Sequence, residues 1–207
     1  MMVQGMLRAF LVTLCLPWAF ASRALQASDI VYPLRNIRPE GIHRLSRNEA
    51  NLMGLGEDRH VLVSELLFGG VKAVNLANGD VTQVVQRGEA RDRLGVDVNF
   101  GNGYILVLGA GFADGGADAL RVYDAATGSF VTSCLAPAEQ GGFMLDVEVV
   151  GNTAYVTDAV VNALWTVDLT QVSSGSSCEM VGIVLPAQWF LPRNDVSFMA
   201  VGKFVSA

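Results

Sequence analysis

The chain has 207 residues, enough for one sizeable domain, and 51% of them are hydrophobic while only 16% are charged. Its 22 glycines and its low charge favour an architecture of strands and turns over a helical or a disordered one. The net charge is −6 and the 14 basic residues are scattered, so no basic patch is available for a phosphate backbone, which argues against nucleic-acid binding.

The first 21 residues, Met1–Ala21, are predicted to be a secretory signal peptide. Arg8 supplies the only charge before an apolar run over 9–20, and Ala19-x-Ala21 is a small-residue cleavage site. The apolar run is shorter than the roughly 20 residues that a spanning helix needs, which favours cleavage over a membrane anchor. The mature protein is therefore expected to be secreted, or to reside in the secretory lumen, without a membrane anchor.

Three segments with the same strand pattern follow a short extended segment at 22–37. They span about 38–88, 94–137 and 143–186, and a fourth copy begins at about 194–207. Each contains four runs rich in Val, Leu, Tyr and Thr that alternate with turns, which is typical of a four-stranded antiparallel meander. The clearest correspondence pairs Ala119–Asp124 (ALRVYD) with Ala163–Asp168 (ALWTVD).

The spacing of the copies predicts the fold class. The first strands start at Glu40, Leu94, Leu145 and Asn194, which are 54, 51 and 49 positions apart. A period near 50 residues with four strands per unit is the signature of β-propeller blades. The sequence therefore predicts an all-β propeller with about three blades and the start of a fourth. Because a ring cannot close on these strands, we expect an incomplete six-bladed propeller, from a partial gene product or a fragment.

Neither a catalytic role nor a ligand-binding role is predicted for two polar loops and two histidines. Residues 48–59 are expected to form a polar loop in the first copy. The glycine-rich insertion Gly109–Asp118 resembles a dinucleotide-binding turn, but too few residues precede the next strand for the helix that such a site requires, which favours a surface loop. His43 and His60 have no partner at metal-ligand spacing and are expected to be surface or strand residues.

The cysteines leave one question open. Cys15 would be removed with the signal peptide, so Cys134 and Cys178 are the cysteines of the mature chain. An oxidising compartment permits a disulfide between them. The alignment of the copies places them on outer strands of neighbouring blades, one late and the other early in its strand. Their Cα atoms are then expected to lie too far apart, so the sequence favours unpaired cysteines and leaves the disulfide as the alternative.

Acidic side chains recur where the first strand of each copy begins: Glu40, Asp97, Asp146, Glu148 and Asp195. In a propeller these positions surround one mouth of the central channel. Carboxylates that converge there could bind a hard divalent cation through oxygen ligands. The alternative is that they cap turns or face solvent.

Three short motifs resemble the six-bladed propellers of the senescence marker protein / gluconolactonase-like superfamily: Pro39-Glu40-Gly41-Ile42, Tyr155-Val156-Thr157-Asp158 and Asn194-Asp195-Val196. Active members of that family hydrolyse lactones or related esters around a divalent cation, often Ca²⁺. The resemblance implies Glu40 and Asn194 as metal ligands and Asp146 as a catalytic base or a residue behind the ligands. Leu94 and Leu145 stand at the other two ligand positions, where an apolar side chain cannot coordinate Ca²⁺.

Two functions follow. The first is Ca²⁺-dependent hydrolysis of a small-molecule lactone or ester. The second is non-catalytic binding of an extracellular protein, with loops such as Gly109–Asp118 as the recognition surface. Since only one carboxylate, Glu40, remains among the implied ligands, cation binding is expected to be in the millimolar class and residues 22–207 are expected to show no lactonase activity.

Overall fold

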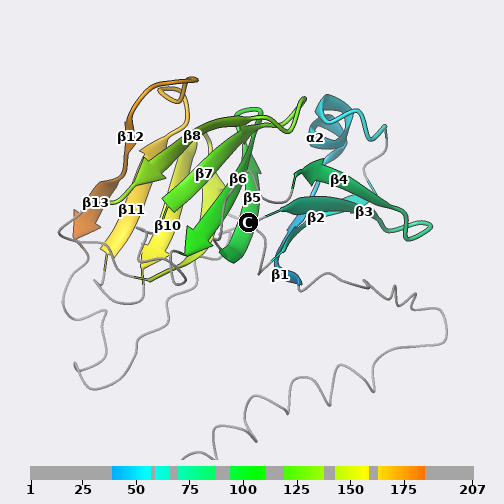
Figure 1. The fold of residues 1–207 in the computed structure, drawn as a ribbon, viewed down its shortest axis with the longest axis horizontal. Helices are drawn as coiled ribbons and strands as arrows, with labels where there is room; N and C mark the ends of the chain where they lie inside the picture. The colour runs from blue at the N-terminus through cyan, green and yellow to red at the C-terminus, as the bar shows by residue number, and fades with distance from the viewer. Residues whose placement is uncertain are drawn as a thin grey trace, which may run out of the picture. The chain divides into compact units, whose positions relative to one another are not determined.

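The computed structural model describes residues 39–56, 59–65, 70–86, 94–110, 119–137, 143–158 and 163–184 (Figure 1). All of these residues belong to one compact unit, Asn36–Ala207. The signal peptide, the extended segment 22–37, most of the insertion Gly109–Asp118 and the fourth copy lie outside them, so these features stay predictions. In the part of the chain that is described, no helix is both long and apolar enough to cross a membrane.

Three sheets of antiparallel strands follow one another along the chain (Figure 1). The first sheet contains β1 (Pro39–Arg44), β2 (His60–Glu65), β3 (Val71–Asn75) and β4 (Val81–Val85). The second contains β5 (Leu94–Gly101), β6 (Tyr104–Ala110), β7 (Ala119–Asp124) and β8 (Phe130–Leu135). The third contains β9 (Met144–Val150), β10 (Thr153–Asp158), β11 (Ala163–Asp168) and β13 (Val181–Val184).

The predicted all-β class is confirmed, and each of the three copies forms a four-stranded antiparallel meander, to which the second sheet adds a fifth, parallel strand, β12 (Cys178–Glu179). Each sheet joins its strands in sequence order, and β1, β5 and β9 begin within one residue of Glu40, Leu94 and Leu145. In the turns between the third and fourth strands of the first and second copies, Gly79 and Gly128 adopt φ values of 80° and 70°. Only glycine reaches such values without a steric cost, which is why these hairpins end on it.

The second sheet lies between the other two and is buried on both faces. Alternate side chains of a strand point to opposite faces, so the continuous apolar run along β6 serves two cores. Ile105 and Val107 pack with residues of the first sheet, among them Leu62, Val71 and Ala73. Leu106 and Leu108 pack with residues of the third, among them Val147, Val156 and Trp165. We call these contacts the first and the second interface.

The first strands of the three sheets are neighbours in space. Strand β1 packs against β5, and β5 packs against β9. The side chains at the starts of these strands are therefore brought together although they are about 50 positions apart in the sequence. This arrangement positions the candidate site.

A helix occupies part of the segment that was predicted to be a loop. Helix α2 (Arg47–Leu52) starts after Ser46, whose Oγ accepts a hydrogen bond from the Glu49 backbone N–H at 3.4 Å. The Glu49 carboxylate accepts one from the Ser46 backbone N–H at 2.6 Å, which completes a capping box. The prediction of an unbroken loop over 48–59 was therefore wrong, and the Ser-x-x-Glu spacing was the signal that identifies the helix start.

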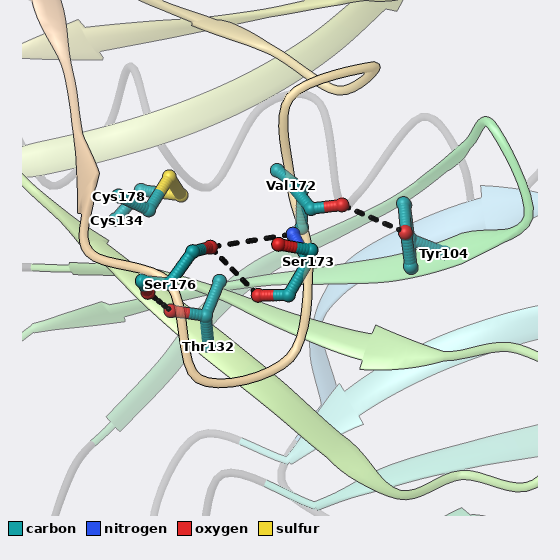
Figure 2. Close-up of a disulfide and its surroundings, with 7 residues drawn as sticks. All are labelled: Tyr104, Thr132, Cys134, Val172, Ser173, Ser176 and Cys178. Carbon is teal, nitrogen blue, oxygen red and sulfur yellow. Dashed lines mark hydrogen bonds between the residues drawn. A yellow bond between two sulfur atoms is a disulfide. The ribbon is translucent and has the colours of Figure 1, made fainter.

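Cys134 and Cys178 form a disulfide with a Cα–Cα distance of 4.4 Å (Figure 2). The prediction of unpaired cysteines was wrong because it placed Cys178 at the start of the outer strand of the third sheet. Cys178 instead belongs to β12 (Cys178–Glu179), which pairs in parallel with β8 of the second sheet and lies directly opposite Cys134. The outer strand of the third sheet is β13, which begins at Val181.

Residues 169–180, which we call the strap, leave the third sheet after β11 and lie along the second sheet before returning to β13. The Met180 backbone N–H donates to the Leu135 carbonyl at 2.9 Å. Tyr104 Oη donates to the Val172 carbonyl at 3.1 Å and Thr132 Oγ1 to the Ser176 carbonyl at 3.0 Å (Figure 2). In the β5–β6 turn, Asn102 Nδ2 donates to the Leu169 carbonyl at 2.9 Å. The strap thus connects the two sheets by hydrogen bonds as well as by the disulfide.

Candidate functional site

Two predicted site residues, Asp97 on β5 and Asp146 on β9, meet at the strand starts. Their carboxyl groups share a side-chain hydrogen bond. Asp97 Oδ2 also accepts a hydrogen bond of 3.0 Å from the backbone N–H of Val147, the residue after Asp146. The Asp97 carboxyl group therefore contacts both a side chain and the backbone of the neighbouring sheet.

The environment of the pair favours a shared proton. Burial of the largely buried Asp97 carboxyl group raises its pKa to about 7, and the hydrogen bond to Asp146 acts in the same direction. Backbone hydrogen bonds from Val147 and Val98 oppose this shift because they stabilise the charged form. Two carboxyl groups in hydrogen-bond contact cannot both ionise cheaply, so the contact favours the form in which one of them keeps its proton.

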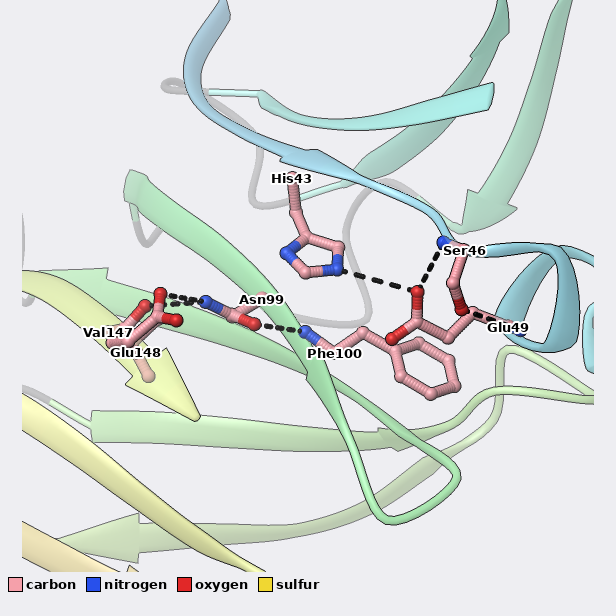
Figure 3. A network of polar contacts seen from close by, with 7 residues as sticks. All are labelled: His43, Ser46, Glu49, Asn99, Phe100, Val147 and Glu148. Carbon is pink, nitrogen blue, oxygen red and sulfur yellow. Dashed lines mark hydrogen bonds and ion pairs between the residues drawn. The ribbon is translucent and has the colours of Figure 1, made fainter. Parts of the chain in front are cut away.

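Asn99 is a second link between β5 and β9 that the sequence-based reasoning did not select. Its Nδ2 donates to the Val147 carbonyl at 2.9 Å and to Glu148 Oε2 at 3.0 Å (Figure 3). Its Oδ1 accepts from the Phe100 backbone N–H at 2.7 Å, so both ends of the buried amide are engaged. The signal in the sequence was a polar residue two positions after the aspartate in both copies, Asn99 and Glu148.

Gly41 on β1 bounds the site on the side of the first sheet. Its backbone N–H donates to Ser64 Oγ at 2.9 Å. A Cβ atom at Gly41 would overlap the Asp97 carboxylate and would lie 2.6 Å from Asp97 Cα. Only a residue without a side chain allows β1 to approach β5 this closely, which gives the glycine of the Pro39-Glu40-Gly41-Ile42 motif a steric reason.

The structure describes only part of the calcium site that the resemblance implies. Glu40 is exposed on β1, and Asn194 lies outside the described residues. Among the described residues, no three His, Cys, Asp or Glu side chains are placed to hold a metal ion together. The metal ligands Glu40 and Asn194 and the cation therefore stay predictions.

His43, Ser46 and Glu49 lie together but are not arranged as a nucleophilic triad (Figure 3). His43 Nε2 is 3.8 Å from Glu49 Oε2, and that carboxylate already binds the Ser46 backbone N–H. In a triad the histidine would receive the serine proton, but Ser46 Oγ accepts a hydrogen bond from the Glu49 backbone here. The group caps helix α2. His43 and His60 lie in β1 and β2, so the prediction that they are strand residues is confirmed.

Asp158, the last residue of the Tyr155–Asp158 motif, makes hydrogen bonds within its own sheet. It is buried at the end of β10, where its carboxylate accepts hydrogen bonds from Trp165 Nε1 at 3.3 Å and from the Phe143 backbone N–H at 3.1 Å. The corresponding end of β2 carries Glu65, whose carboxylate lies 3.2 Å from Lys72 Nζ. The first and the third copy thus each place a buried carboxylate beside a donor on the next strand, which satisfies a charge that would otherwise be costly to bury.

No protein-family model matches the chain, and no curated protein matches it. The similarity to gluconolactonase-like propellers therefore rests on the three short motifs and stays a proposal.

Proposed function

We propose that the three sheets are successive blades of a gluconolactonase-like six-bladed propeller, and that the secreted protein binds an extracellular protein without catalysis. The sheets follow one another in sequence order, each is a four-stranded meander, and their first strands are neighbours. These features are expected of blades arranged around an axis.

The observation that carries the proposal is the bonding of the strand-start carboxyl groups. In a propeller hydrolase these groups would face a cation or a substrate. Here Asp97 binds Asp146 and the Val147 backbone, and Glu148 binds Asn99. The carboxyl groups of neighbouring sheets are engaged with each other, which supports a role in holding the sheets and leaves recognition to the loops.

The recognition surface is proposed at the end of the sheets where the first strands begin. The connections 66–69, 111–118 and 159–162 join second to third strands at that end, because Ala110 pairs with Leu94 and Asp158 pairs with Met144. The connection 111–118 is twice as long as 159–162 in the third copy. Long connections at one end of a rigid scaffold are where binding residues concentrate.

Loop exchange tests the binding proposal. The secreted chain and a variant whose residues 111–118 are replaced by the sequence of 159–162 would be cross-linked in conditioned medium under identical conditions. We expect a cross-linked protein partner with the parent chain and its loss with the variant, while circular dichroism stays unchanged. Equal cross-linking of both chains would overturn the assignment of the loop.

Hydrolysis by the Asp97–Asp146 pair is the second candidate, because a carboxyl pKa of about 7 suits acid–base chemistry at neutral pH. The Asp146 carboxylate would take a proton from a water molecule while the oxygen of that water attacks the lactone carbonyl carbon. Protonated Asp97 would then protonate the ring oxygen as the carbon–oxygen bond breaks. The hydroxy acid leaves, and the proton on Asp146 returns to Asp97 through their shared hydrogen bond.

A lactone assay separates the two candidates. We expect δ-gluconolactone to open at the buffer rate with the secreted chain, with and without added Ca²⁺. Hydrolysis that Asp146→Asn abolishes and Glu40→Gln retains would overturn the binding proposal in favour of the carboxyl pair. Hydrolysis that requires Ca²⁺ and is lost in Glu40→Gln would instead support the metal site that the resemblance implies.

A further inference from the structure

We propose that Asn102 is a site of spontaneous covalent modification, at which deamidation to aspartate or isoaspartate loosens the contact between the second sheet and the strap. The modification needs only water as a co-reactant and is independent of the proposed binding function. Two features of the chain point to it: the glycine that follows Asn102, and the hydrogen bond that joins the Asn102 amide to the strap.

The chain contains two Asn-Gly pairs, Asn78-Gly79 and Asn102-Gly103, and each lies in a hairpin turn. Asparagine is chemically labile, and most so before glycine, because no side chain shields the glycine backbone nitrogen from the asparagine amide. Both asparagines are exposed, so water can reach either of them. The two pairs therefore offer the same reaction, and their surroundings decide what the reaction changes.

Deamidation proceeds through a cyclic imide. The Gly103 backbone nitrogen forms a bond to Asn102 Cγ, the Cγ–Nδ2 bond breaks, and the side-chain nitrogen leaves as ammonia with the proton of the glycine N–H. One water molecule then opens the imide at one of its two carbonyl carbons. Opening at Cγ gives aspartate, and opening at the main-chain carbonyl gives isoaspartate. The sum is asparagine plus water to a carboxylic acid plus ammonia, with no oxidation or reduction.

The amide that would be lost holds the first residue of the strap. Asn102 Nδ2 donates to the Leu169 carbonyl at 2.9 Å. The Leu169 side chain is fully buried in the core of the second interface. It also packs against the turn, because a Cβ atom at Gly101 would lie 3.0 Å from Leu169 Cδ1. The reacting side chain is therefore located where the β5–β6 turn and the strap are in contact.

Either product weakens this contact. A carboxylate accepts hydrogen bonds but cannot donate one, so the Leu169 carbonyl would lose its donor and face a negatively charged oxygen. Isoaspartate also lengthens the main chain by a methylene group inside a turn that closes on the Gly101–Tyr104 pair. Tyr104 in turn donates to the Val172 carbonyl of the strap, so a distorted turn disturbs a second strap bond.

Asn78 provides a matched reference in the same chain. Its Nδ2 donates to Asp80 Oδ2 at 2.7 Å, and its Oδ1 accepts from the Asp80 backbone N–H at 3.0 Å. Both contacts lie within the turn between β3 and β4 of the first sheet. Deamidation of Asn78 therefore changes a local contact and leaves the strap bonds in place.

Peptide mass spectrometry tests the modification itself. The folded chain and the urea-unfolded chain would be aged side by side at mildly alkaline pH, and conversion at positions 78 and 102 would be followed over time. We expect aspartate and isoaspartate peptides at position 102 of the folded chain, formed more slowly than in the unfolded chain because the bond to Leu169 must break first. An Asn102 amide that stays intact in the folded chain while the unfolded chain converts would overturn the site.

Urea unfolding tests the consequence for the strap. We expect Asn102→Asp to lower the folded-to-unfolded ratio about tenfold and Asn78→Asp to lower it less. Ageing should lower the ratio of the parent more than that of Asn102→Gly, which has no amide at this position. Equal losses in the two aspartate variants, or the same fall on ageing in the parent and in Asn102→Gly, would overturn the loosening of the strap.

Discussion

The two interfaces of the second sheet are made by copies of the same repeat, yet they are held in different ways. The first interface combines an apolar core with close backbone approaches at Gly41 and Gly128, where a Cβ atom would overlap Asp97 and the Val84 carbonyl. The second adds the disulfide, the strap hydrogen bonds and the polar links from Asp97 and Asn99 to β9. Equivalent surfaces of a repeat can therefore be stabilised by close packing on one side and by a disulfide and hydrogen bonds on the other.

Removal of the disulfide should be the largest perturbation of the second interface. The bridge joins residues 44 positions apart, and closing a loop of that length corresponds to about 4 kcal/mol of unfolded-state entropy. We expect the double variant Cys134→Ala/Cys178→Ala to lose roughly 2–4 kcal/mol of unfolding free energy in urea titrations. Dithiothreitol should destabilise the parent equally and leave the double variant unchanged. A loss below about 0.5 kcal/mol would show that the strap is held without the bridge.

Gly41→Ala should be the corresponding perturbation of the first interface. The new methyl group would lie 2.6 Å from Asp97 Cα and 2.7 Å from the Val98 backbone nitrogen. Strand β5 is paired with β6 at these residues, so its backbone cannot move aside easily. Overpacking of this kind costs typically about 1–3 kcal/mol, to be measured by thermal or urea unfolding. Ile42→Ala is the control, because the neighbouring side chain is 65% exposed and its loss should cost little. Equal stability of Gly41→Ala and the parent would refute the close approach of β1 to β5.

Substitution of Asn102 tests the hydrogen bond between the β5–β6 turn and the strap. This residue adopts φ = 50° and donates to the Leu169 carbonyl, so Asn102→Ala removes the hydrogen bond and adds left-handed strain. We expect a loss of about 1–3 kcal/mol in unfolding free energy. Asn102→Gly removes the same bond without the strain and should cost less. If glycine costs as much as alanine, the backbone conformation of the turn contributes nothing.

Tyr104→Phe should give the smallest effect. The hydroxyl donates to the Val172 carbonyl at 3.1 Å, and a single neutral hydrogen bond contributes about 0.5–1.5 kcal/mol. The loss should shrink in the cysteine double variant if the strap has already left the second sheet, which a double-mutant cycle would measure. Tyr155→Phe on the third sheet is a matched control outside the strap. A larger loss from the control than from Tyr104→Phe would contradict the assignment of this bond to the strap.

The features that the sequence predicted correctly, strands and turns, depend on the pattern of residues that are close in the chain. Short runs rich in Val, Leu, Tyr and Thr, separated by turn residues, were sufficient to place the strands and turns, because both follow from the geometry of a single strand or turn. Helix α2 was missed although its capping box is local, since a one-and-a-half-turn helix has no hydrophobic period to reveal it. The disulfide was mispredicted because β12 pairs with the preceding sheet, a choice that no pattern within 169–180 expresses.

The sequence identified most of the residues of the candidate site but not the hydrogen bonds between them. Recurrence at the strand starts selected Asp97 and Asp146, and these residues do meet. Their hydrogen bond depends on the distance between β5 and β9, which is set by core residues far from either in sequence. Asn99 escaped notice for the same reason, because its partners Val147 and Glu148 lie 48 and 49 positions away.

The disulfide also affects how the chain responds to cleavage. Cys134 and Cys178 enclose the first three strands of the third sheet and both of the turns between them. A protease that cuts once inside that loop would leave two pieces joined through sulfur, so a nicked molecule would keep its mass apart from one added water. Such damage would be visible on a gel only after reduction, and intact size in a non-reducing sample would not prove an intact backbone.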